Sequence, residues 1–112
     1  MSNVSEPFTV RTFDDDGSVL LVLSGELDIA TAPRLQRAVS DVLGDRLQVL
    51  TVDVAAVSFL DVRGQRTLVE ASAAVAGVGS RFELRGVRDS LRRAIHLVGF
   101  EELQRAAEVE SI

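Results

Sequence analysis

The run Leu47-Gln48-Val49-Leu50-Thr51-Val52-Asp53-Val54, followed closely by Ser58-Phe59-Leu60-Asp61, decides the fold of this chain. The first run is rich in β-branched residues and is short, so it predicts a buried strand rather than a helix. A helix is expected next, from about Arg63 to Ala76. Its inner face is predicted to consist of small and apolar residues at helical spacing: Leu68, Ala71, Ser72, Val75 and Ala76.

Strand-like and helix-like segments also precede this unit. Residues 8–13 and 19–23 read as two strands that flank Asp14-Asp15-Asp16-Gly17, and this acidic run predicts a hairpin turn rather than a calcium loop. Residues 19–23 are apolar at every position, which is typical of a strand covered on both faces. A helix over about 31–43 follows, with Thr31 near its start and Pro33 in its first turn.

The C-terminal third continues the alternation. Residues 81–85 alternate charged and apolar side chains, as a half-exposed strand does. A last helix is expected after them, with Asp89 and Ser90 as candidate caps and Gly99 as its stop. We therefore predict one α/β domain over residues 1–112. It has a mixed, mostly parallel sheet of four to five strands with an N-terminal hairpin, and three main helices packed against it. Residues 1–6 are expected to be disordered and residues 106–112 to fray.

The composition of the 112 residues excludes several kinds of site. The chain has no cysteine and no lysine, since all 12 basic residues are arginine. Its one histidine, His96, is expected at the surface or the rim of the last helix. Thiolate chemistry, a Schiff base and a histidine zinc site are therefore excluded. The net charge of −5 argues against nucleic-acid binding. No membrane span or secretory pattern is present, so we expect a cytoplasmic protein with a protein partner and without cofactor, metal or enzymatic activity.

The residues between the central strand and its helix are the first candidate site. Either Val62 occupies the N-cap, or Asp61 caps the helix and Val62 is its first residue. The free amides of a helix N-terminus favour negative charge, and Val62 is a poor cap, so the first arrangement breaks a local rule. Arg63 is a contact to a partner, a charge that blocks such a contact, or a solvated surface arginine for which Asp61 is a possible ion-pair partner.

Two further groups of charged residues leave alternatives open. Asp28 also follows a strand, so Asp28 and Asp61 share one edge of the sheet if the two strands are neighbours. Two close carboxylates can act as acid and base or hold a cation, but no histidine or lysine accompanies them, and Asp28 more simply orders its loop. A basic cluster near the last helix is either a solvated face or a surface for an acidic partner: Arg85, Arg88, Arg92 and Arg93.

Taken together, these segments resemble the STAS domains and, within that family, the stand-alone bacterial anti-sigma factor antagonists. The resemblance is carried by residues 23–35 (LSGELDIATAPRL), 52–54 (VDV), 57–61 (VSFLD), Gly64, 84–87 (LRGV) and 95–100 (IHLVGF). It implies a protein that binds an anti-sigma factor, itself a serine kinase, and thereby frees a sigma factor for transcription. In the family, phosphorylation of the residue after the motif Asp breaks that complex.

Carried over to this chain, the motif Asp is Asp61, the acidic residue of the first loop is Asp28, and Gly64 is the glycine that lets a partner approach closely. The phosphoacceptor position falls on Val62 and the following Ser/Thr position on Arg63, so neither carries a hydroxyl. The resemblance and the motif spacing together predict a partner-binding surface of eight residues: Asp28, Thr31, Ser58, Asp61, Val62, Arg63, Gly64 and Thr67.

Two hypotheses follow for the function. In one, the chain is an antagonist that a kinase cannot switch off, unless Ser58, Thr67 or Thr31 accepts phosphate instead. In the other, Arg63 has altered the docking surface, and the chain is a non-phosphorylatable STAS subunit of a larger signalling complex. A STAS domain that binds a nucleotide or small ligand is a further alternative, whereas a phospho-receiver domain is disfavoured by the missing lysine and the initial hairpin. A monomer or weak homodimer is expected.

Overall fold

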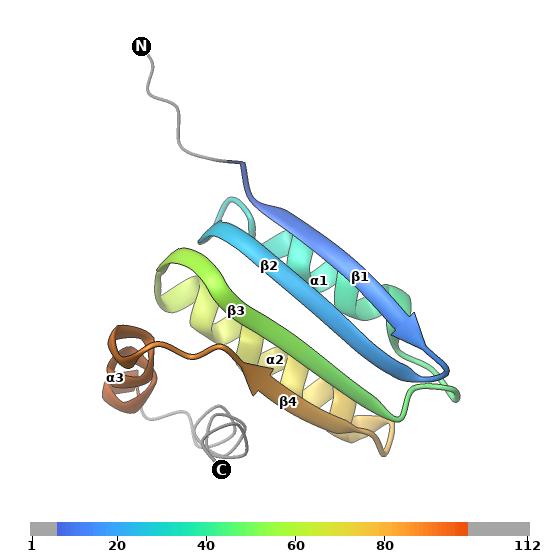
Figure 1. The fold of residues 1–112 in the computed structure, drawn as a ribbon. Helices are drawn as coiled ribbons and strands as arrows, with labels where there is room; N and C mark the ends of the chain where they lie inside the picture. Colours follow the sequence, from blue (N-terminus) through green and yellow to red (C-terminus); the bar gives the residue numbers. More distant parts are fainter. Residues whose placement is uncertain (1–6, 99–112) are drawn as a thin grey trace.

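The computed structural model describes residues 7–98, and of residues 95–98 the backbone only. Seven elements follow in chain order: β1 (Thr9–Asp15), β2 (Ser18–Leu27), α1 (Ala32–Val42), β3 (Val49–Leu60), α2 (Val62–Gly77), β4 (Arg81–Arg85) and α3 (Asp89–Val98). The sheet order is β1-β2-β3-β4, with β1 antiparallel to β2 and the other neighbours parallel (Figure 1). The predicted mixed sheet with an N-terminal hairpin is confirmed, with four strands.

The hairpin between β1 and β2 turns at two residues. Asp16 and Gly17 both have positive φ, 52° and 92°, which is the backbone of the tight turn whose twist matches two antiparallel strands. The Asp14 carboxylate accepts a hydrogen bond from the Gly17 N–H at 3.2 Å, so one acidic side chain of the run stabilises the turn. The turn prediction is confirmed. Within residues 7–98 no three potential ligand side chains gather to hold a metal ion.

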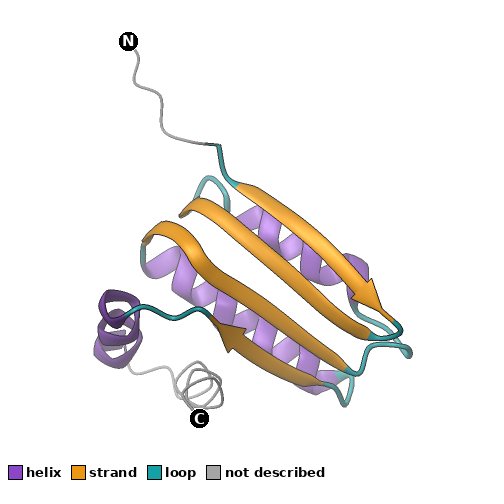
Figure 2. Ribbon diagram, viewed as in Figure 1, coloured by secondary structure: helices purple, strands orange, loops and turns teal. Residues whose placement is uncertain are grey.

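Helices α1 and α2 both pack on one face of the sheet, as Figure 2 shows. The core lies between them and the strands, and its fully buried side chains include Leu21, Leu23, Leu35, Leu50, Val52 and Leu68. On β2 the buried residues alternate with the half-buried Leu20 and Val22, which point to the opposite face. No described element covers that face, so the expectation that residues 19–23 are covered on both sides was wrong. An unbroken apolar run does not indicate which face of the sheet the connecting helices cover.

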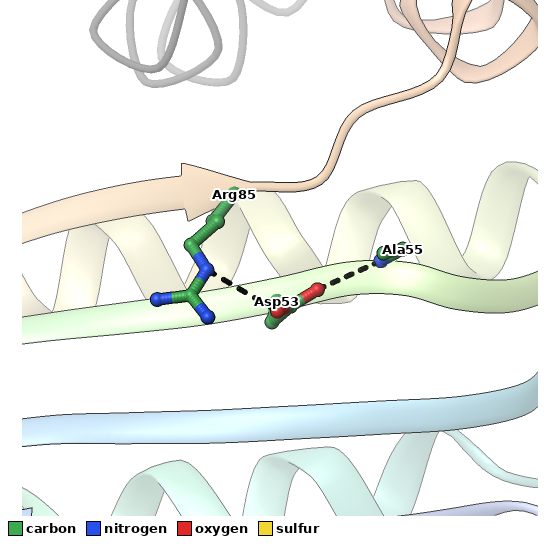
Figure 3. Close-up of polar contacts among 3 residues, drawn as sticks. All are labelled: Asp53, Ala55 and Arg85. Carbon is green, nitrogen blue, oxygen red and sulfur yellow. Dashed lines mark hydrogen bonds and ion pairs between the residues drawn. The ribbon is translucent and has the colours of Figure 1, made fainter.

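Strand β3 is longer than the sequence predicts, and it contains an irregularity at Val54 and Ala55. Val22 pairs with Asp53 and Ser24 with Ala56, so two residues of β3 stand opposite Leu23 alone. The Asp53 carboxylate accepts a hydrogen bond from the Ala55 N–H at 2.9 Å, and its other oxygen lies 3.3 Å from Arg85 Nε (Figure 3). Asp53 thereby gives a partner to an amide that the bulge removes from the regular ladder.

Several predictions for the two ends of the chain concern residues that the structure does not describe. The last helix is present as α3, but Asp89 is its first residue, so Asp89 and Ser90 lie in the first turn and not at the cap that the sequence suggested. The rim position of the His96 side chain, the stop at Gly99 and the fraying of residues 106–112 lie outside the described residues, as does the expected disorder of residues 1–6. No helix within residues 7–98 combines the length and apolar character needed to cross a bilayer.

Candidate functional site

The start of α2 is capped by Asp61. Its Oδ1 accepts a hydrogen bond of 2.8 Å from the Gly64 N–H, and its backbone carbonyl accepts the first helical bond from Gln65. Val62 is therefore the first residue of the helix, which decides between the two arrangements that the sequence left open. Val62 breaks no capping rule, because the cap beside it is a preferred residue.

Gly64 brings α2 unusually close to the end of β2. A Cβ atom at this position would lie 2.4 Å from the carbonyl oxygen of Leu27 and 2.9 Å from a methyl carbon of Leu60. The same Leu27 carbonyl accepts a hydrogen bond from the Asp61 N–H at 3.3 Å. The structure thus gives an internal reason for this glycine, in addition to the close approach of a partner that the family resemblance implies.

The loop between β2 and α1 is held by Asp28 and Thr31. Asp28 Oδ1 accepts hydrogen bonds from the N–H groups of Ala30 and Thr31, at 3.0 and 3.1 Å. The Thr31 hydroxyl accepts from the Asp28 N–H at 2.9 Å and donates to the Glu26 carbonyl at 2.8 Å. The Asp28 side chain therefore orders its loop, as the simpler interpretation of the sequence holds.

Three exposed apolar side chains lie at or just beyond the ends of β2 and β3. Ile29 is 66% exposed, Phe59 52% and Val62 59%, and these are three of the five exposed large hydrophobics within the described side chains. The strand ends lie side by side, because Leu27 pairs with Leu60. We call Ile29, Phe59 and Val62 the edge patch. An exposed apolar group of this kind is typical of a protein-interaction site.

Sequence reasoning identified Val62 but not the exposure of Ile29 and Phe59. Phe59 sits next to an irregularity in β3, since Gly25 pairs with Val57 but Glu26 with Phe59. Ser58 is the extra residue between these two pairs, so the alternation of inner and outer residues shifts there. The signal in the sequence is weak: Phe59 and Ile29 are apolar residues that lie outside the regular spacing of their neighbours.

The remaining candidate residues divide between surface and interior. Ser58 and Arg63 are exposed, and Arg63 makes no ion pair with Asp61 or any other described residue, so that suggested pairing was wrong. Thr67 is 2% exposed, and its hydroxyl donates to the Arg63 carbonyl at 3.0 Å.

A second buried polar residue of α2, Gln65, is 4% exposed, and its Oε1 has no hydrogen-bond partner within the described structure. The sequence analysis missed this residue.

The basic cluster proves to be partly structural. Arg85 is paired with Asp53 as described above, and Arg88 Nη2 donates a hydrogen bond to the carbonyl of Val57, near the end of β3. Arg93 is exposed and Arg92 half-buried on α3. Arg85 and Arg88 thus each have a partner on β3, although both side chains remain exposed.

Comparison with known proteins identifies the family. The family model described as "Mlab, STAS domain" matches residues 11–105 of the chain. The chain belongs to the STAS domain family. Its relatives include the anti-sigma-F factor antagonist RsfB of Mycobacterium tuberculosis, which is 32% identical over 97 residues, covering 87% of this STAS chain and 79% of RsfB.

Solved structures agree with this assignment. The crystal structure of an anti-sigma factor antagonist from Mycobacterium paratuberculosis matches with a TM-score of 0.73 and 30% identity, covering 97% of this STAS domain and 100% of that chain. The unphosphorylated form of the anti-sigma factor antagonist SpoIIAA matches with a TM-score of 0.72, covering 88% of this domain and 84% of SpoIIAA. At 18% identity, this second likeness shows the fold alone. The family resemblance predicted from the sequence is confirmed.

Proposed function

We propose that this STAS domain is a regulator of the anti-sigma factor antagonist type, acting in the bacterial cytoplasm. It binds an anti-sigma factor of the serine-kinase class through the edge patch, and it is not phosphorylated at residue 62. The observation that supports this most directly is the position of Val62. It is the first residue of α2 and 59% exposed, at the place that the family resemblance assigns to the phosphoacceptor.

The chemistry of residues 62 and 63 supports the second half of the proposal. Phosphoryl transfer requires an oxygen that attacks the γ-phosphorus of ATP while ADP leaves. The Val62 side chain holds only carbon, and the Arg63 guanidinium remains protonated, with five N–H donors and no acceptor. The start of α2 therefore keeps the neutral apolar surface at residue 62 that corresponds to the unphosphorylated state.

The geometry supports a division of the eight predicted partner residues into two roles. Asp28, Thr31 and Asp61 use polar atoms in hydrogen bonds within their own loops, and Gly64 and Thr67 are buried. We assign these five to shaping the surface. Direct contact is assigned to the exposed side chains at this end of the sheet, because a partner can cover only side chains that reach the surface: Ile29, Ser58, Phe59, Val62 and Arg63.

The partner class rests on the relatives. RsfB and the Mycobacterium paratuberculosis protein are both named as anti-sigma factor antagonists, at 32% and 30% identity over most of this chain. An anti-sigma factor is therefore the first partner to test. The absence of a hydroxyl at residue 62 distinguishes this chain from the switch that the family resemblance implies.

The test combines binding and phosphate transfer. The full chain is titrated calorimetrically with the anti-sigma-F factor that RsfB antagonises and with the anti-sigma factors of its own genome, and then incubated with each of them and ATP. We expect at least one to bind, and mass spectrometry to find no phosphate on residues 62 and 63. Val62→Ser is expected to gain phosphate from a bound kinase, whereas the matched Val78→Ser, at the far end of α2, is not. Failure of every anti-sigma factor to bind contradicts the proposal.

A further inference from the structure

We infer that Ser58 is a phosphorylation site of this protein, modified by an ATP-dependent protein serine kinase, and that Arg88 contacts the resulting phosphate. This regulation is separate from residue 62, which has no hydroxyl. Its effect on partner binding rests on the function proposed above, but the modification itself does not.

The sequence left three hydroxyl groups near the end of the sheet as candidate phosphorylation sites. The structure distinguishes them by their exposure and by their hydrogen bonds. The Thr31 hydroxyl is half-buried and is used in hydrogen bonds to the backbone of Glu26 and Asp28. The Thr67 hydroxyl is buried and donates to the Arg63 carbonyl. Ser58 is exposed, and its hydroxyl has no hydrogen-bond partner among the described residues. Of the three, Ser58 alone presents a free nucleophile to a kinase.

The irregularity in β3 explains why Ser58 is presented in this way. Val57 and Phe59 each have a partner on β2, whereas Ser58 is inserted between them without one. A bulge of this kind turns a side chain out of the regular alternation and is frequent beside functional sites. Val57 is buried, and Ser58 and Phe59 are both exposed, so two consecutive side chains reach the surface instead of one.

A guanidinium already lies against the Ser58 backbone. Arg88 Nη2 donates to the carbonyl of Val57, which belongs to the peptide bond that joins Val57 to Ser58. Ser58 and Arg88 line the same groove of about 180 Å³ between the end of β3 and α3. Arginine presents five N–H donors in a fork that matches phosphate oxygens, so donors remain after the bond to Val57 is made.

Ser90 lies in the same groove and is also exposed, but its setting differs. It follows Asp89 directly, and a phosphate placed next to a carboxylate is disfavoured by repulsion between like charges. Ser58 is flanked by Val57 and Phe59, and Arg88 lines the same groove. The groove therefore favours phosphate on Ser58 over phosphate on Ser90.

The chemical step is simple. The Ser58 oxygen attacks the γ-phosphorus of ATP, the new O–P bond forms, and the bond between that phosphorus and ADP breaks. The hydroxyl proton passes to a base on the kinase. The product carries about −1.5 to −2 charge at pH 7 next to Phe59, which belongs to the edge patch. Because burying that charge against an apolar partner surface is costly, the modification is expected to weaken docking.

The first experiment maps the modification. The purified full chain is incubated with ATP and an extract of the cells it comes from, and phosphopeptides are located by mass spectrometry. We expect phosphate on Ser58, loss of that label in Ser58→Ala, and its retention in the matched variant Ser90→Ala. A chain without label, or one labelled only at other residues, overturns the inference.

The second experiment tests the contact with Arg88. Phosphoserine is incorporated at position 58 during expression, and its second pKa is measured by phosphorus NMR. We expect a pKa below that of a phosphoserine peptide of residues 55–61, because a nearby guanidinium favours the doubly charged form. Replacing Arg88→Gln in the same protein is expected to raise the pKa towards the peptide value. Equal values in protein and peptide overturn the role of Arg88.

The third experiment separates this inference from the proposed function. The unmodified and the phosphoserine-58 proteins are titrated with the anti-sigma factor that binds the unmodified chain. We expect at least tenfold weaker binding after modification, and equal affinities overturn the regulatory role. If no anti-sigma factor binds the unmodified chain, the proposed function fails, while the mapping of phosphate to Ser58 still decides the modification.

Discussion

The Asp61 carboxylate accepts a hydrogen bond of 2.8 Å from the backbone N–H of Gly64, three residues further along the chain. This bond fixes the first residue of α2, and with it the place of Val62 at the surface. It also joins the two motif residues that the family resemblance singled out, so their first role in this chain is local structure. The structural role of each residue can therefore be tested by the free energy of unfolding of its variants, before any partner is known.

Replacing Asp61→Ala is expected to lower the free energy of unfolding by about 0.5–2 kcal/mol, because one free amide of the first turn loses its acceptor. Asp61→Asn keeps a side-chain oxygen at the same position and is expected to retain most of the stability. Urea denaturation followed by circular dichroism measures both. Equal losses in the two variants would show that the negative charge, rather than the cap, stabilises α2.

Gly64→Ala is expected to destabilise the fold by about 1–3 kcal/mol, because its Cβ would lie 2.4 Å from the Leu27 carbonyl oxygen and α2 would have to shift. The last residue of the same helix provides a matched control. A Cβ at Gly77 meets nothing within 4 Å, and alanine favours the helical backbone over glycine. Gly77→Ala should therefore leave stability unchanged or raise it by up to about 1 kcal/mol in the same denaturation experiment.

Gln65→Met is expected to stabilise the protein by about 1 kcal/mol. The side chain is 4% exposed and its Oε1 has no partner within the described structure, and an unsatisfied buried polar atom typically costs about 1–3 kcal/mol. Methionine has a similar length and no polar oxygen. The control is Gln36→Met on the exposed side of α1, which should change the melting temperature little. A lower melting temperature for Gln65→Met contradicts the prediction.

The order of elements could be predicted from the sequence because the signals were local. The Asp16-Gly17 turn and the helix α2 both depend on a few neighbouring residues, and both were confirmed. Of the predicted inner face of α2, Ser72 is only half-buried and Ala76 is exposed, so that part of the prediction was wrong. The uncovered face of the sheet was not predictable in this way. The apolar run of β2 fits a strand covered on one face or on both, and the connecting helices decide between them.

The end of β3 shows a second limit. The strand continues from Val49 to Leu60, but its alternation is interrupted near Ala55 and again at Ser58. The alternation of buried and exposed residues along β3 shifts twice within twelve residues, so the sequence shows no regular strand pattern there. The exposure of Phe59 and the outward position of Ser58 both follow from these shifts, so the details of the candidate site required the structure although the location of the site did not.

The edge patch makes a direct prediction for partner binding. Val62→Asp is expected to weaken binding to an anti-sigma factor at least tenfold, which corresponds to about 1.4 kcal/mol. A carboxylate at this position must lose water when the apolar surface is covered, and that cost of desolvation weakens binding. Helix stability should not fall, because a negative charge in the first turn is favourable.

Val78→Asp is the matched control for this prediction. Val78 is also an exposed valine, at 47%, but it lies at the other end of α2, away from the edge patch. Its substitution should leave the dissociation constant unchanged in the same calorimetric titration. If both substitutions weaken binding equally, the effect comes from net charge rather than from the patch. If neither does, the partner binds elsewhere on the domain, and the assignment of Ile29, Phe59 and Val62 to the interface is wrong.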